Sequence, residues 1–244
     1  MKRTVAILLS NLALVACNMS AEAEPGERGG GPAVTRSYDL AGFDSVGLAG
    51  SQDVEVSVGG PFAVRAEGDA DTIERLDLRV ENGTLKIGTK RDGIRIGWSR
   101  DRPPTRIFVT LPAIRAASLA GSGDLRIDRV QGERFDASVA GSGDIQIGEL
   151  RVAALAARVA GSGNIKAAGT AETAEISIAG SGDVDVGSVQ SRTASASVVG
   201  SGDARIQASE TANVSIAGSG DVWVTGSARC TISKRGSGEV HRDA

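Results

Sequence analysis

The sequence predicts an all-β fold, a parallel β-helix or β-solenoid with coils of 18–20 residues. The first observation is a Gly-Ser-Gly tripeptide that begins at residues 121, 141, 161, 180, 200, 218 and 236. The second is the alternation of apolar and polar residues around each tripeptide, which is typical of strands with one buried face. The third is composition: 33 glycines and 3% aromatic residues predict many tight turns around an aliphatic core.

An acidic or amide residue follows each tripeptide, and together they predict the corner of a coil. Glycine reaches backbone conformations that are closed to other residues, and serine and aspartate side chains hydrogen-bond to backbone groups of turns. Each repeat is expected to read strand, corner, strand and short connection. A Cβ at Gly141 or Gly143 is expected to strain its corner. The principal corner residues are Gly121, Gly123, Asp124, Gly141, Gly143, Asp144, Gly161, Gly163, Asn164, Gly180, Gly182, Asp183, Gly200, Gly202, Asp203, Gly218, Gly220 and Asp221.

Units this short cannot bury an apolar face alone, so stacking is expected. Parallel stacking about 4.8 Å apart pairs each backbone with the coils above and below. The usual chirality of parallel crossovers favours a right-handed coil. Cys230 lies six residues before Gly236, in a slot that holds small or apolar residues in other coils. It is therefore expected to be an inert core residue.

Residues 1–16 predict a bacterial lipoprotein signal peptide. Lys2 and Arg3 precede a short apolar stretch that ends in Leu14-Val15-Ala16-Cys17. This ending resembles the lipobox, in which the cysteine becomes the lipid-bearing first residue. An ordinary signal peptide with a chance cysteine is the alternative. In lipoproteins of this kind an aspartate after the cysteine favours retention in the inner membrane, so with Asn18 at that position the resemblance implies the outer membrane.

The remainder divides into a tether, a cap and the repeats. Residues 17–33, the lipidated cysteine and its small polar neighbours, predict a flexible tether. Residues 34–111 predict an irregular β cap or first coils, with a degenerate corner at Gly50-Ser51-Gln52-Asp53 and a hairpin that turns at Asn82-Gly83. Residues 112–244 predict the repeat solenoid, continuous with 34–111 as one domain.

The end of the chain offers only a thin cap for the last coil. The tail after Val240 is short, so the final strands are expected to leave backbone groups unpaired. This predicts end-to-end association of two copies.

Several of these features together resemble a known family. They are Phe43-Asp44-Ser45-Val46, Val80 to Ile87, Ile107 to Pro112 and the repeated corner. In this combination the chain is similar to the auto-transporter adhesin head GIN domain family over about residues 40–240. The resemblance implies a β-helix-like fold related to the pectin-lyase type in secreted or envelope proteins of bacteria. It implies adhesion as the function and carries over no catalytic residue.

The acidic corner residues are expected to stack along one edge. Carboxylates about 5 Å apart repel by about 3 kcal/mol at an effective dielectric constant near 20. Capping of turn amides is the simpler interpretation, and shared calcium is the alternative. Asn164 interrupts the charge, and the repeat is about twice the length of a calcium-binding nonapeptide. The calcium alternative involves Asp124, Asp144, Asp183, Asp203 and Asp221.

Two aromatic features are candidate contact surfaces. Arg95, Trp98, Arg100 and Arg102 form a basic, aromatic stretch that could contact anionic lipid headgroups or acidic glycans. A solvated hairpin is the alternative interpretation. Trp223 is expected in an outward slot, where it could stack on a sugar ring or make a local surface contact.

Catalytic signals are weak. His241 is the single histidine and lies in the tail, so a Ser-His-Asp or Cys-His arrangement is not expected. No zinc-ligand cluster is visible, no cofactor is expected, and a net charge of -3 gives no case for nucleic acid. The sequence favours a non-enzymatic envelope lipoprotein, an adhesin or scaffold with multivalent contacts to glycan or another envelope protein. The alternatives are an enzyme acting on envelope polysaccharide and a calcium-stabilised module.

Overall fold

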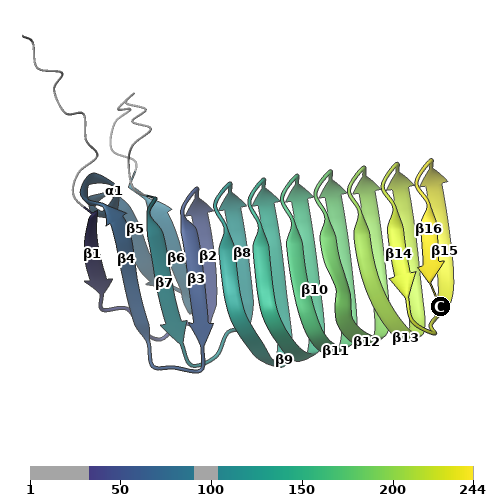
Figure 1. Cartoon of the computed structure of the whole chain (residues 1–244), viewed down its shortest axis with the longest axis horizontal. Coiled ribbons are helices and arrows are strands. Elements are labelled where there is room, and N and C mark those ends of the chain that lie inside the picture. The colour runs from purple at the N-terminus through teal and green to yellow at the C-terminus, as the bar shows by residue number, and fades with distance from the viewer. Residues whose placement is uncertain (1–32, 91–103, 244) are drawn as a thin grey trace, which may run out of the picture.

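The computed structural model describes residues 33–90 and 104–243 and confirms the all-β parallel solenoid, which makes about six turns. Its coils stack along one long axis (Figure 1). Each coil contributes to two walls. We call the strands that run into the corners the entry wall, and the strands that leave the corners the exit wall.

The central coils are continuous strands, each running from one corner to the next. The sequence predicted a short connection between the two strands of each repeat. In the structure these residues belong to the same continuous strand and pair with the neighbouring coils. Neighbouring coils pair in parallel and in phase, so that Gly141 lies opposite Gly161 and Gly161 opposite Gly180. These strands are β9 (Leu125–Gly141), β10 (Ile145–Gly161), β11 (Ile165–Gly180), β12 (Val184–Gly200) and β13 (Ala204–Gly218).

Differences in coil length are absorbed away from the corners. The two 20-residue coils containing β9 and β10 pair without a register shift. The 19-residue coil of β11 shifts against both neighbours, between Ile147 and Leu150 on one side and between Lys166 and Ala168 on the other. The β12–β13 pair, where the length falls from 20 to 18, shifts twice. The corners therefore stay aligned whatever the coil length.

The core is a set of columns in which each inward side chain packs on its counterparts in adjacent coils. One such column contains Phe135, which is fully buried and lies opposite the smaller Leu155 of the next coil. The column continues through Leu155, Ala174, Ala194, Ala212 and Cys230. From Phe135 through Leu155 to Ala174, the inward side chain of this column becomes smaller.

Antiparallel strands end the stack at its N-terminal side, which confirms the expected irregular β cap. On the entry wall, β6 (Thr84–Thr89) runs parallel to β2 (Ser45–Gly50) and forms an antiparallel hairpin with β5 (Leu76–Glu81). Asn82 and Gly83 both have positive φ, 50° and 73°, as the predicted Asn-Gly turn requires. β2 also pairs in parallel with β8 (Ala116–Gly121), the entry strand of the next coil, which leads into the regular repeats.

The exit wall has a corresponding cap. β7 (Arg106–Leu111) runs parallel to β3 (Asp53–Val58), and β4 (Ala63–Asp69) and β1 (Ala33–Tyr38) then add in antiparallel orientation. A five-residue helix, α1 (Ala70–Glu74), follows β4. In the described ranges, no helix is long and apolar enough to cross a membrane.

The C-terminal end of the stack is open. β14 (Val222–Thr225) and β16 (Val240–Asp243) continue the exit wall, and β15 (Arg229–Gly236) continues the entry wall. Cys230 occupies the predicted slot opposite Ala212 and packs against the core as a free thiol. The Cys230 side chain is only half-buried.

Candidate binding surfaces

The two corner glycines are required for different reasons. The first of each corner has a φ between +120° and +144° from Gly121 to Gly236, a conformation that favours glycine. The second has no such φ but lies against the preceding coil: a Cβ at Gly143 would be 2.0 Å from the carbonyl oxygen of Gly123. In the degenerate corner at residues 50–53, Gln52 occupies the position of the second glycine. No Gly-Ser-Gly corner precedes this corner in the sequence.

Close approach of successive corners also satisfies their backbone. The carbonyl oxygen of Gly121 accepts hydrogen bonds from the N–H groups of Ser142, at 2.9 Å, and Gly143, at 3.1 Å. The same paired bonds recur at the next corners, to Gly141, Gly161, Gly180 and Gly200. The corner is thus the point where the backbones of adjacent coils come closest.

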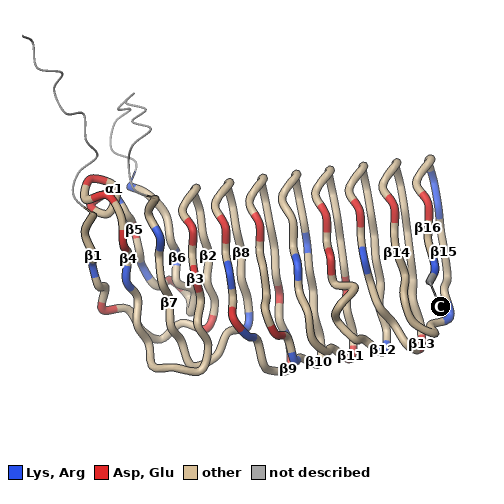
Figure 2. The backbone as a smooth tube through the Cα atoms, in the orientation of Figure 1, with Lys and Arg blue, Asp and Glu red and all other residues tan. Residues whose placement is uncertain are grey.

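The acidic corner residues form a hydrogen-bonded ladder on the exit wall, where acidic residues recur near the corners of successive coils (Figure 2). One carboxylate oxygen of Asp183 accepts the backbone N–H of Asp203 at 2.9 Å. Asp144 accepts the N–H of Asn164 at 2.9 Å, and the Asn164 amide oxygen accepts the N–H of Asp183 at the same distance. Asp124 instead forms an ion pair with Arg126 at 3.1 Å. These side chains cap the turns of the following coil.

The same contacts bear on the calcium alternative. Asp144, Asp183, Asp203 and Asp221 each use one oxygen to cap a backbone N–H. Across the part of the chain that the structure describes, no group of three or more His, Cys, Asp or Glu side chains is arranged to hold a metal ion. At Asn164 a neutral amide oxygen accepts the backbone N–H of the next coil, just as the aspartate carboxylates do. A turn cap does not need a negative charge.

The entry wall carries a row of serines. Register places one outward residue from each coil in line, and in six of the seven coils from β8 onward it is serine, with Arg158 as the exception. The row is Ser118, Ser138, Arg158, Ser177, Ser197, Ser215 and Ser233. A parallel row of exposed small residues lies beside it, nearer the corners: Ala120, Ala140, Ala160, Ala179, Val199 and Ala217.

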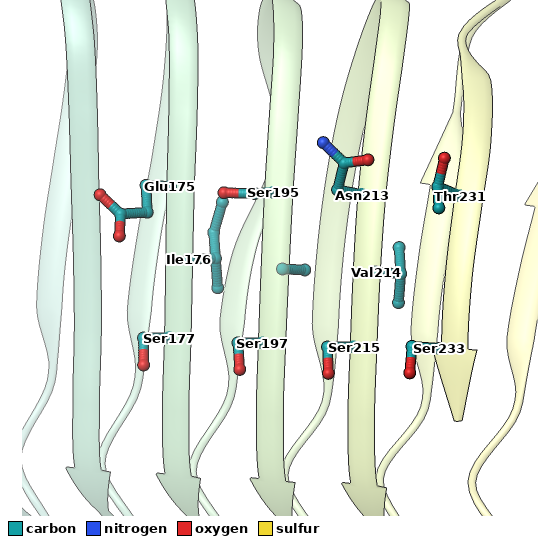
Figure 3. Close-up of a pocket in the computed structure, with 11 residues that line it drawn as sticks. Glu175, Ile176, Ser177, Ser195, Ser197, Asn213, Val214, Ser215, Thr231 and Ser233 are labelled. Atoms are coloured by element: carbon teal, nitrogen blue, oxygen red, sulfur yellow. The ribbon is translucent and has the colours of Figure 1, made fainter. Parts of the chain in front are cut away.

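A shallow groove of about 370 Å³ runs along the serine row (Figure 3). One side is formed by Ser177, Ser197, Ser215 and Ser233, and the other by Glu175, Ser195, Asn213 and Thr231. Its side chains are small, and from Ser195 to Ser233 they carry no charge. The groove crosses several coils, so a ligand lying in it would meet the same side-chain chemistry at each strand spacing, about 4.8 Å.

Charged side chains separate this groove from the N-terminal half of the entry wall. Arg158 pairs with Asp136 at 3.3 Å and with Glu175 at 3.6 Å. Asp136 also accepts two hydrogen bonds from Arg134, both at 2.7 Å. These bonds from Arg134 lower the pKa of the Asp136 carboxyl, against a smaller opposing effect of burial, and Arg158 adds to the lowering.

The exit wall has the opposite character. Its outward row consists of large side chains, several of them charged and of both signs: Glu55, Arg126, Gln146, Lys166, Asp185, Arg205, Trp223 and His241. Lys166 pairs with Asp185 at 3.7 Å. A second groove of about 390 Å³ lies against Arg126, Gln146 and Lys166. The charged residues that line it, Arg126 and Lys166, are both cations, and each forms an ion pair with an aspartate, Arg126 with Asp124 and Lys166 with Asp185.

Trp223 lies in the outward slot that the sequence predicts, but its ring is covered by neighbours. The guanidinium carbon of Arg205, one coil before, is 4.7 Å from the ring centroid. The ring of His241, one coil after, is stacked at 5.1 Å with an interplanar angle of 19°. Because Arg205 and His241 pack against the Trp223 ring, the structure favours a local surface contact for Trp223 over stacking of a sugar on its ring.

The other predicted contact residues, Arg95, Trp98, Arg100 and Arg102, and the predicted lipid site Cys17 lie outside the described residues.

The serine row is the feature that the sequence interpretation missed. A serine precedes the first corner glycine by three residues in most repeats, as in Ser215-Ile216-Ala217-Gly218. The spacing is as regular as that of the corner itself.

Comparisons with solved structures identify relatives of the same fold. A structure described as a putative adhesin from Bacteroides fragilis superposes with a TM-score of 0.78 at 22% identity, covering 87% of this chain and 97% of its own. A putative lipid binding protein from Parabacteroides distasonis gives 0.71 at 24% identity, covering 88% and 98%. A putative adhesin from Parabacteroides merdae gives 0.71 at 17%, with the same coverages.

No protein among the curated sequences matches this chain. A family match, however, covers most of the solenoid and its cap, from residue 42 to residue 228. With its repeated corner, parallel coils and antiparallel cap, the chain belongs to the family described as "Putative auto-transporter adhesin, head GIN domain".

Proposed function

We propose that this chain is a non-enzymatic, adhesin-like protein of the cell envelope that binds an uncharged, repetitive glycan along its entry wall. The observation that carries the proposal is the register-aligned serine row with its groove, lined by Ser177, Ser197, Ser215 and Ser233. The rigid stack holds these side chains at a fixed spacing.

The chemistry of the groove matches a ligand rich in hydroxyls. A serine hydroxyl both donates and accepts hydrogen bonds, so each coil can pair with a sugar hydroxyl in either sense. The adjacent Val199, which is 56% exposed, and Ala217 offer apolar contact for the carbon face of a sugar ring. Each coil contributes a weak contact, and affinity arises from several coils acting on one chain.

Family membership supports an adhesin-like role. The names of the structural relatives agree in part: two are described as putative adhesins, and one as a putative lipid binding protein. We place the protein in the envelope, exported by the predicted signal peptide and held by lipid at Cys17, with Asn18 favouring the outer membrane. Two or more acyl chains are enough for such an anchor to be stable.

A depletion assay tests the binding proposal. Purified protein is mixed with insoluble neutral polysaccharides (cellulose, chitin and a β-1,3-glucan), and the unbound fraction is measured. We expect binding to at least one of them, and Ser215→Arg, which places a bulky cation in the groove, should abolish it. Gln146→Arg adds the same exposed cation on the exit wall and should bind like the wild type. Failure of the wild type to bind, or equal binding by S215R, contradicts the proposal.

The enzyme alternative predicts a different result from the same mixtures. Soluble oligosaccharides should then accumulate over time in the presence of the wild-type protein. We expect retention of the protein on the polysaccharide without release of sugar.

A further inference from the structure

The last coil differs from all others in two inward slots. In β15, Lys234 lies opposite Ile216. In β16, Arg242 lies opposite Val224. Both cationic residues are exposed at this end of the stack.

The same two slots are apolar and buried in the coils before. The Lys234 column contains Leu119, Val139, Val159, Ile178, Val198 and Ile216. The Arg242 column contains Val56, Ile127, Ile147 and Ala167, and, after the register shift between β11 and β12, Val186, Ile206 and Val224. A cation takes the place of an aliphatic side chain only at the terminal coil.

The position of these cations determines what can pair with the open edge. β15 and β16 present unpaired backbone groups, which are a template for another strand. A strand that continued either column would cover Lys234 or Arg242 and remove its charge from water. Burial of an unpaired cation against aliphatic side chains is costly, because neither the Ile216 nor the Val224 side chain can compensate the charge.

We propose that Lys234 and Arg242 terminate the solenoid by preventing a second copy of this chain from stacking on its C-terminal edge. The rest of this end is poorly protected: Ile232 is 45% exposed and Cys230 is half-buried. Without the two cations, the terminal coil would present an apolar column end beside an unpaired strand edge. This arrangement opposes the end-to-end association that the short tail suggests.

Substitutions copied from the preceding coil provide the test. Lys234→Ile and Arg242→Val give the last coil the residues of the one before it. The control, Arg229→Thr with Arg235→Ala, removes the same number of cations from outward slots, opposite Thr211 and Ala217. All proteins carry Cys17→Ser, which leaves Cys230 as the single cysteine of the chain.

Sedimentation equilibrium across a wide concentration range measures association. We expect the wild type and the control to remain monomeric. The double variant K234I/R242V should self-associate, with a dissociation constant lower than that of the control by roughly tenfold or more. Association through this end should also slow the reaction of Cys230 with a maleimide, in proportion to the associated fraction.

Two results would overturn the proposal. One is a wild-type protein that already associates with protection of Cys230, and the other is a double variant that stays monomeric. The single variants K234I and R242V each retain one cation. If the double variant fails to fold, they decide the question: each should associate more tightly than the control, and monomeric behaviour of both contradicts the proposal.

Discussion

The carboxylate of Asp203 accepts a hydrogen bond from the backbone N–H of Asp221, at 2.8 Å, and so links two successive corners. The same link joins Asp183 to Asp203 and Asp221 to Glu239. The ladder is directional: each side chain caps the backbone of the next coil. The acidic edge is therefore part of the mechanism that aligns the corners.

Substitution of Asp203 separates capping from charge. Asp203→Asn keeps an oxygen acceptor, as Asn164 does naturally, so the free energy of unfolding should change by less than about 0.5 kcal/mol. Asp203→Ala removes the acceptor and should cost about 1 kcal/mol. Urea unfolding of the two variants measures the difference.

The same pair of variants tests the calcium alternative. If the ladder bound calcium, D203N would lose stability as D203A does, and EDTA would lower the melting temperature of the wild type. We expect EDTA to leave that temperature unchanged.

The second corner glycine should be intolerant of any side chain. A Cβ at Gly182 would lie 2.0 Å from the carbonyl oxygen of Gly163, so Gly182→Ala should destabilise the fold by about 1–3 kcal/mol or more. Gly187→Ala is the matched control in the same coil, because its nearest neighbour would be the Cβ of Arg205 at 3.4 Å. Thermal melting should show a clear loss for G182A and little change for G187A. Equal melting temperatures would contradict the close packing of the corners.

Stability should fall in acid partly through Asp136. Hydrogen bonds from Arg134 lower the pKa of this carboxyl in the folded state. Its contribution is therefore present above the unfolded aspartate pKa, about 3.9, and is lost as the pH falls through the lower folded value. Asp136→Asn should be less stable than the wild type at neutral pH and should lose less stability on acidification. Urea midpoints measured from neutral pH into acid check this, and parallel curves for the two proteins would refute it.

The lipid anchor makes a prediction about the cell. When the full chain is expressed in a Gram-negative host and labelled with radioactive palmitate, the wild type should incorporate label and fractionate with membranes. Cys17→Ser should do neither. Absence of label from the wild type would argue for an ordinary signal peptide, and label on C17S would contradict Cys17 as the lipid site.

The repeat architecture could be predicted from the sequence because each coil repeats the same short-range sequence pattern. The corner glycines mark the turns, and alternation around them identifies inward residues such as Val214 and Ile216. The Asn82-Gly83 hairpin was equally local and is present as predicted. These features depend on steric constraints between residues close in the sequence, or on packing against the corresponding residue of the adjacent coil.

The cap and the binding surface needed long-range information. The parallel pairing of β6 with β2, and the antiparallel addition of β4 and β1 beyond β7, join segments that no short-range signal connects. The covering of Trp223 by Arg205 and His241 likewise depends on exact register between coils. Coils of different length shift against each other, so their spacing in the sequence does not give that register directly.

The dependence of affinity on ligand length tests the central claim most directly. Calorimetry would follow the binding of wild-type protein to a series of neutral oligosaccharides of increasing length, chosen from the polysaccharide that retains the protein. Because each coil adds one weak contact, we expect affinity to rise with each added sugar until the ligand spans the serine row, with no shortening of the ligand. An affinity that does not change with length, or the appearance of shorter products, would contradict the account.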